Sequence, residues 1–258
     1  MNIAELSIKE IKAMLEKLDE LPKDFLQWLK EDKRAGVQEL ARRHEAALQR
    51  QEKLAQQWAE MTKYECALRD KGYRHLFGVD EVGRGPLAGP VVAAAVCLPE
   101  DFYLPGLNDS KKVPAATREA YYEIILRDAA AIGIGVVDAA RIDAINILNA
   151  TKEAMHKAIV AADLAPDACL IDAVQLTGLS CEQVPIIGGD GKSVSIAAAS
   201  IVAKVTRDRM MAEFARDYPA YGFEKHAGYG TAEHLAAIER YGPSPIHRMT
   251  FTGVKKQA

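Results

Sequence analysis

The sequence predicts an α/β fold in which helices flank a mixed β-sheet, with a small all-helical domain in front and a tail with a short helix behind. Two observations predict it. Residues 1–71 are poor in glycine and carry apolar side chains at helical spacing. From residue 75 onward, short apolar runs bounded by Gly and Pro come first and then alternate with helical segments. We therefore expect two domains, residues 1–71 and residues 72–258.

The N-terminal region contains three helical segments. Ser7 and Glu10 form a capping-box pattern at the start of the first. Pro22 is well placed to begin the second, which Gly36 would end. The third segment covers about residues 37–70, where apolar residues recur at spacings of three, four and seven.

The basic residues of this region suit two different roles. They alternate with acidic residues, as on a solvated helix face of an appendage that docks and stabilises. A substrate clamp is an equally weighted alternative, because Arg42 and Arg43 could contact phosphates and Trp28 and Trp58 could stack on bases.

The second domain begins with strands. Two apolar runs separated by a Gly- and Pro-rich turn predict an antiparallel pair at residues 75–82 and 90–98. Further apolar runs predict strands at 132–138, at 168–173 and near 184–190. Helical spacing or capping residues predict helices at about 114–130, 139–163 and 195–217.

Composition narrows the function classes. The chain has 258 residues, 49% of them hydrophobic, which is enough for a full core. It has neither an apolar run long enough for a transmembrane helix nor a basic, then apolar N-terminus, so we expect no membrane segment and no secretory signal. The four cysteines show neither CxxC spacing nor a paired pattern. This suits a reduced, cytoplasmic compartment and argues against a zinc site. The net charge of −3 means that a nucleic-acid partner must be held by local cations and metal ions.

The stretch GVDEVGRGPLAGP at 78–90 carries the main chemical signal. An apolar run leads into Asp80 and Glu81, which a glycine-rich turn follows. Adjacent side chains on a regular strand point to opposite faces, so we expect the strand to end, bulge or twist here. A solvated acidic turn is the alternative interpretation of this stretch taken alone.

Two further apolar runs end in acids, at Asp172 and Asp190. Acids at the ends of neighbouring strands converge in α/β folds, and four carboxylates in one place repel unless cations compensate them. Ligation by oxygen alone favours Mg²⁺ or Mn²⁺, and a pair of such ions suits hydrolysis of a phosphodiester. The sequence therefore predicts a nuclease site with two divalent ions.

Other motifs fail. The turn reads GxGxxxG, not the dinucleotide fingerprint GxGxxG, and GDGKS at 189–193 lacks the first glycine of a phosphate-binding loop. A metal-binding or nucleic-acid-binding module without catalysis stays open, because residue types alone do not prove turnover.

The chain resembles bacterial ribonuclease HII, also called type 2 ribonuclease H. The resemblance runs through the stretch at 78–90, DSKK at 109–112, LIDA at 170–173, GGDGKSVSIAAASIVAKVTRDRMM at 188–211, YGFEKHAGYGT and GPSPIHRMTF. It covers about residues 72–252. It implies a ribonuclease H-like fold and cleavage of the RNA strand of RNA/DNA hybrids, including 5′ of a ribonucleotide embedded in DNA.

The resemblance also implies residue roles. Asp80, Glu81, Asp172 and Asp190 correspond to the catalytic, metal-binding acids. The residues implied to bind substrate are Gly83, Arg84 and Gly85 at the ribose 2′-hydroxyl, Ser110 and Lys111 at phosphates, and Tyr229 at the following sugar. Ala227 stands where the family usually has lysine.

We therefore expect a cytoplasmic, monomeric endoribonuclease that uses Mg²⁺ or Mn²⁺, binds RNA/DNA hybrids and DNA containing ribonucleotides, and does not bind membranes. Its products would carry a 3′-hydroxyl and a 5′-phosphate. The alternatives are a hybrid-binding protein without catalysis and a resolvase-like DNA nuclease on the same fold.

Overall fold

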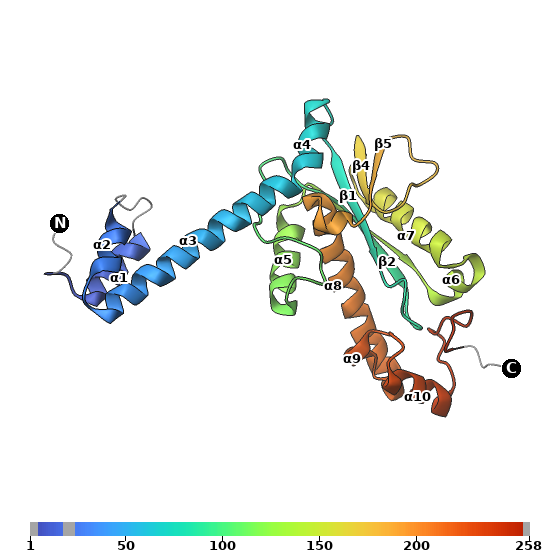
Figure 1. The fold of residues 1–258 in the computed structure, drawn as a ribbon. Coiled ribbons are helices and arrows are strands. Elements are labelled where there is room, and N and C mark those ends of the chain that lie inside the picture. The colour runs from blue at the N-terminus through green and yellow to red at the C-terminus, as the bar shows by residue number, and fades with distance from the viewer. Residues whose placement is uncertain (1–4, 18–23, 255–258) are drawn as a thin grey trace. The chain divides into compact units, whose positions relative to one another are not determined.

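The computed structural model describes residues 5–17 and 24–254. It divides into two compact units, Met1–Gln57 and Trp58–Ala258 (Figure 1). The division falls within α3 (Ala35–Met61), ahead of the domain boundary expected at residues 71–72. The reason is that the following helix, α4 (Lys63–Asp70), packs with the second unit: its Leu68 is buried in a cluster with residues of the sheet.

The first unit consists of α1 (Ile8–Lys17), α2 (Phe25–Glu31) and most of α3. The predicted capping box is confirmed. The Ser7 backbone N–H donates to the Glu10 carboxylate at 2.8 Å, and the Glu10 N–H donates to the Ser7 hydroxyl at 3.3 Å. The three helices share a small core, formed by Ile11, Phe25, Leu29, Val37 and Ala41.

The predicted end of the second helix is wrong. The helix ends at Glu31, and Gly36 lies in the first turn of α3. Asp32 accounts for this, because its carboxylate accepts hydrogen bonds from the Arg34 backbone N–H at 2.8 Å and from the Arg34 guanidinium. The predicted helix start at Pro22 lies outside the described residues.

The side chains considered for a substrate clamp differ in their surroundings. Arg42 and Arg43 both pair with Glu39 on an exposed face of α3. Trp28 is 44% exposed. Trp58 is half-buried and packs against the rings of residues 102–103, so it is not a free stacking surface.

The second unit is built on a mixed five-stranded sheet with the order β3-β2-β1-β4-β5. The strands are β1 (Leu76–Val82), β2 (Val91–Cys97), β3 (Ala131–Val137), β4 (Ala168–Asp172) and β5 (Glu182–Ile186). The predicted antiparallel pairing of β1 with β2 is confirmed. β3 pairs antiparallel with β2, whereas β4 is parallel to both β1 and β5.

Helices cover both faces of this sheet (Figure 1). One face packs against α5 (Ala115–Asp128) and α8 (Val194–Asp217), and the other packs against α7 (Ile147–Ala161), which follows α6 (Ala139–Ile145). Gly78 lets α8 approach β1, since a Cβ at this position would lie 1.9 Å from the Ser195 carbonyl carbon. The helical stretch predicted at 139–163 is divided at Asn146, whose side chain caps α7.

The C-terminal part of the chain folds at the far end of α8 as α9 (Phe223–His226), α10 (Ala232–Tyr241) and connecting loops (Figure 1). It forms a core of its own with the 87–88 segment that follows β1. Among the described residues, no helix combines the length and the apolar character that a bilayer crossing requires.

Candidate active site

Three acidic side chains meet where β1 and β4 lie side by side. The ladder between these strands ends at Val79 and Ile171, so the next residues in register are Asp80 and Asp172. Single carboxylate oxygens of Asp80, Glu81 and Asp172 all lie within 4.8 Å of one another.

The strand β1 has no bulge at the two acids and ends at Val82, directly after Glu81. Its ladder with β2 stays regular through Glu81 to Val82. It is β4 that stops, at Asp172, so the sheet opens on that side and the longer Glu81 side chain reaches the same space as Asp80.

Asp80 is the most buried of these acids, with 5% of its surface exposed. Burial raises the pKa of its carboxyl well above the usual value, and the nearby Glu81 and Asp172 carboxylates raise it further. A hydrogen bond with Ser200 of α8 opposes that rise in pKa. Without other compensation, the Asp80 carboxyl therefore tends to hold a proton.

Glu81 has one oxygen paired and one oxygen free of partners. Burial raises the pKa of its carboxyl, while the Arg84 guanidinium, with Nη1 at 3.2 Å from Oε1, counteracts the rise. Within the described part of the chain, the buried Glu81 Oε2 has no hydrogen-bond partner. A buried acceptor without a donor is costly, so the cluster is suited to a cation.

Asp190 is placed differently from the prediction. The strand β5 ends at Ile186, and Asp190 lies beyond it on the single 3₁₀ turn η2 (Gly189–Gly191), because Gly188 turns the chain in a left-handed conformation. Burial raises the pKa of the Asp190 carboxyl, and the neighbouring carboxylates of Asp109 and Asp172 add to the effect. The Asp109 side chain also lies within hydrogen-bonding reach of Asp190, which raises the pKa of the Asp190 carboxyl as well.

The turn η2 is tied to the three-acid group by its backbone. The Gly189 N–H donates to Asp172 Oδ1 at 2.7 Å. Asp190 therefore borders the group, although its oxygens do not lie within the 4.8 Å set formed by the other three acids.

Family models match nearly the whole chain. A model described as Ribonuclease HII matches residues 77–254, and one described as Ribonuclease HII N-terminal domain matches residues 7–69. The ribonuclease HII of Bacillus licheniformis is 52% identical over 253 residues, covering 97% of this chain and 98% of the relative. That of Bacillus subtilis is 50% identical over 250 residues, with the same coverage of both chains.

The chain belongs to the ribonuclease HII family. It is accordingly a hydrolase of the ribonuclease H class. Among solved structures, the ribonuclease H2 of Pyrococcus horikoshii OT3 is similar with a TM-score of 0.59 and 26% identity, covering 70% of this chain and 95% of that one. The ribonuclease H-like mixed sheet with flanking helices, predicted from the sequence, is thereby confirmed.

Members of the ribonuclease HII family depend on divalent metal ions, and the acids of this chain fit such an ion. The donor set consists of oxygens alone, which suits Mg²⁺ or Mn²⁺. The unpaired Glu81 Oε2 supplies a ready ligand. The raised pKa values of Asp80 and Glu81 indicate negative charge that the protein itself does not fully compensate.

The substrate-contact residues predicted from the family resemblance lie in several places. Gly85 and Tyr229 are neighbours, since a Cβ on Gly85 would lie 3.6 Å from the Tyr229 ring. Tyr229 is 45% exposed, and Lys111 is exposed too. Arg84 pairs with Glu81, and its side chain is 45% exposed.

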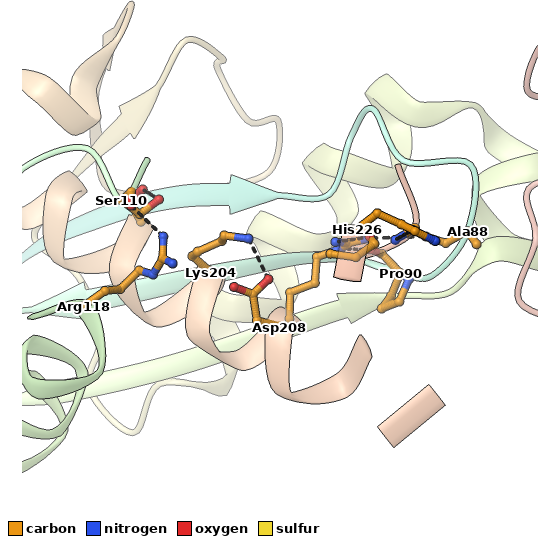
Figure 2. Close-up of polar contacts among 11 residues, drawn as sticks. Ala88, Pro90, Ser110, Arg118, Lys204, Asp208 and His226 are labelled. Atoms are coloured by element: carbon orange, nitrogen blue, oxygen red, sulfur yellow. Dashed lines mark hydrogen bonds and ion pairs between the residues drawn. The ribbon is translucent and has the colours of Figure 1, made fainter. Parts of the chain in front are cut away.

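Ser110 differs from the other predicted contacts because it is 4% exposed. Its hydroxyl forms a 2.9 Å hydrogen bond with that of Ser200, and its carbonyl accepts from Arg118 (Figure 2). The Ser110 side chain therefore supports the helix that contacts Asp80 rather than facing solvent, where a phosphate would bind.

Four residues near the site were missed by sequence reasoning. Asp109 and Ser200 touch the predicted acids, and Arg207 and Arg248 hold the backbone of the glycine-rich turn. The acid that directly precedes the SKK motif was the available signal for Asp109. No local signal marks the others, because serine and arginine residues usually lie at the protein surface. Asp208, on the same helix as Arg207, forms an ion pair with Lys204, whose Nζ lies 2.6 Å from Asp208 Oδ1 (Figure 2).

Proposed function

We propose that this chain is an endoribonuclease that hydrolyses the RNA strand of RNA/DNA hybrids and cuts 5′ of ribonucleotides embedded in duplex DNA. The products would be a 3′-hydroxyl and a 5′-phosphate. The observation that carries the proposal is the meeting of Asp80, Glu81 and Asp172 within 4.8 Å, next to a glycine-rich turn. The family membership supports the same activity.

In this proposal Asp80, Glu81, Asp172 and Asp190 hold two divalent ions, Mg²⁺ or Mn²⁺. When bound, such ions supply an activated water and neutralise charge on the scissile phosphate. Asp80 and Asp172 present their carboxylates from adjacent strands, and the Gly189 N–H holds one Asp172 oxygen in place. The Arg84 guanidinium orients Glu81 through its Oε1, leaving Oε2 available.

The remaining residues of the proposed site recognise the nucleic acid. Gly83, Arg84 and Gly85 contact the ribose 2′-hydroxyl, which distinguishes RNA from DNA. Tyr229 packs its exposed ring against the next sugar, and Lys111 neutralises a phosphate. We assign Ser110 a structural role, in which its hydroxyl holds that of Ser200 by a hydrogen bond, because the Ser110 side chain is buried.

Incubating duplex DNA that carries one ribonucleotide with the full chain and Mn²⁺ tests the activity. We expect one cut, 5′ of the ribonucleotide, and none in the same duplex without it. Asp80→Asn should abolish cutting and retain binding. Wild-type protein that binds the duplex but never cuts it would instead establish a hybrid-binding protein, and cutting of branched DNA without ribose would establish a resolvase-like nuclease.

We further propose that the protein acts as a cytoplasmic monomer and that its N-terminal helices contact nucleic acid. The exposed Trp28 supports that contact. Trp28→Ala in the full chain should weaken hybrid affinity without changing the cleavage position. An unchanged affinity would leave these helices a docking role only.

A further inference from the structure

Two arginines of the second unit are completely buried. Arg207 on α8 and Arg248 in the C-terminal loop are both 0% exposed. Neither forms an ion pair with any residue that the structure describes. Burial lowers the pKa of both guanidinium groups, that of Arg248 to about 9, which keeps Arg248 mainly charged at neutral pH. Buried charges of this kind are costly and need a compensating arrangement.

That arrangement consists of backbone carbonyls of the glycine-rich turn. Arg248 donates from Nη2 to the Gly83 carbonyl at 2.5 Å, from Nη1 to the Arg84 carbonyl at 3.0 Å, and from Nε to the Gly89 carbonyl at 3.0 Å. A planar guanidinium fork is suited to holding several acceptors at fixed directions.

Arg207 holds the other end of the turn. It donates to the carbonyls of Pro90 at 2.9 Å and Ala88 at 3.1 Å, two residues shown in Figure 2. Its third bond, 3.0 Å to the Ala227 carbonyl, connects the turn to the loop that carries Tyr229. The two arginines thus form a clamp, here called the arginine clamp, beneath residues 83–90.

The clamp determines which way two backbone N–H groups point. A trans peptide unit is planar, with its C=O and N–H on opposite sides. Because the carbonyls of Gly83 and Arg84 point inward to Arg248, the N–H groups of Arg84 and Gly85 point away from it. In the part of the chain that the structure describes, neither N–H finds an acceptor.

The two glycines of the turn are present for different reasons. Gly83 has a φ of 93°, and a Cβ there would lie 2.3 Å from Arg207 Nε, so the fold itself requires glycine. The backbone of Gly85 does not have a positive φ, and a Cβ there would meet only the Tyr229 ring, at an ordinary contact distance of 3.6 Å. Glycine at position 85 therefore keeps space open for a group from outside.

We propose that Arg248, assisted by Arg207, is a positioning residue for RNA recognition. It fixes the outward direction of the Arg84 and Gly85 N–H groups so that both meet the ribose 2′-oxygen. This inference rests on the proposed function, in which the same turn senses that oxygen. The buried charges also polarise the peptide groups that they hold, which strengthens the outward donors.

The loop that carries Arg248 has its own anchor. Asp143 of α6 accepts hydrogen bonds from the Met249 N–H at 2.7 Å and from the Thr250 N–H at 3.0 Å. Asp143→Asn keeps the size of this anchor while weakening its bonds. It offers a mild variant for the case in which a substitution of Arg248 prevents folding.

The test measures binding, not turnover. In an Asp80→Asn background with Mn²⁺, affinities are measured for a duplex with one ribonucleotide and for the same duplex made of DNA only. The parent should prefer the ribonucleotide by at least about fivefold, the factor that one of the two neutral hydrogen bonds would typically provide alone. R248K retains the charge but loses the fork, so the preference should fall towards one while affinity for the DNA duplex stays within about twofold.

R209K is the matched control, because Arg209 lies on the same helix as Arg207 but pairs with the exposed Glu119 and Glu123. It should leave the preference unchanged. A preference retained in folded R248K overturns the inference and leaves the proposed function intact. If circular dichroism shows R248K unfolded, D143N must lower the preference, and an unchanged value there overturns the inference as well. A parent without any preference refutes the proposed 2′-hydroxyl sensing itself.

Discussion

Removing one charge from the acid cluster should stabilise the metal-free protein. One carboxylate oxygen from each of Asp80, Glu81 and Asp172 lies within 4.8 Å of the other two. At this distance two full charges repel by about 3 kcal/mol at an effective dielectric constant near 20. Partial protonation of Asp80 relieves some of this repulsion, so we expect Asp80→Asn to gain about 2 kcal/mol, or a melting temperature higher by about 4–8 °C.

The stability gained by Asp80→Asn should increase with pH. The pKa of Asp80 is raised in the folded protein, so the folded state binds this proton more tightly than the unfolded chain does. The stability contributed by that proton is complete below the unfolded pKa of Asp and is lost as the pH rises through the folded pKa. The Asn variant has no such loss, so its advantage over wild type should grow as the pH rises from the unfolded pKa of Asp, about 4, through the raised folded pKa of Asp80.

Thermal unfolding followed by circular dichroism, with EDTA and then with Mn²⁺, measures the effect. Mn²⁺ should stabilise the wild type strongly and the variant weakly, because the variant has lost a ligand. Asp163→Asn, at an exposed position, is the control and should change stability by no more than about 0.5 kcal/mol. An Asp80→Asn protein that melts below wild type in EDTA at alkaline pH, or equal stabilisation of both by Mn²⁺, would refute the reasoning.

Four other substitutions test separate parts of the structure. Gly85→Ala should leave the melting temperature unchanged but lower cleavage of ribonucleotide-containing DNA. Gly83→Ala should instead cost about 1–3 kcal/mol of stability, because Gly83 has a left-handed backbone and a Cβ there would collide with Arg207. Unfolding and cleavage assays on both variants separate the two roles. Tyr229→Ala should raise KM for hybrid cleavage and leave stability unchanged, since the ring is 45% exposed, and a lower melting temperature would count against this. Glu65→Gln should lower stability by about 1–2 kcal/mol, because its buried carboxylate accepts hydrogen bonds at the N-terminus of α8, and an unchanged denaturant midpoint would contradict that role.

Sequence alone determined the strands, most of the helices and the pairing of β1 with β2, because apolar periodicity and turn residues act over short distances. It also identified Asp80, Glu81 and Asp172 as acids that end apolar runs, and the register of β1 with β4 then brings them together.

Tertiary structure decided the features that depend on contacts between distant residues. Ser110 turns inward because Ser200, far away in the chain, bonds to it. Asp190 reaches the site on a 3₁₀ turn that no periodicity signals. Arg207 and Arg248 look like ordinary surface cations in the sequence, and only the carbonyls of the folded turn give them reason to be buried. A local pattern cannot report such partners, because burial is a property of the packed chain and not of its neighbouring residues.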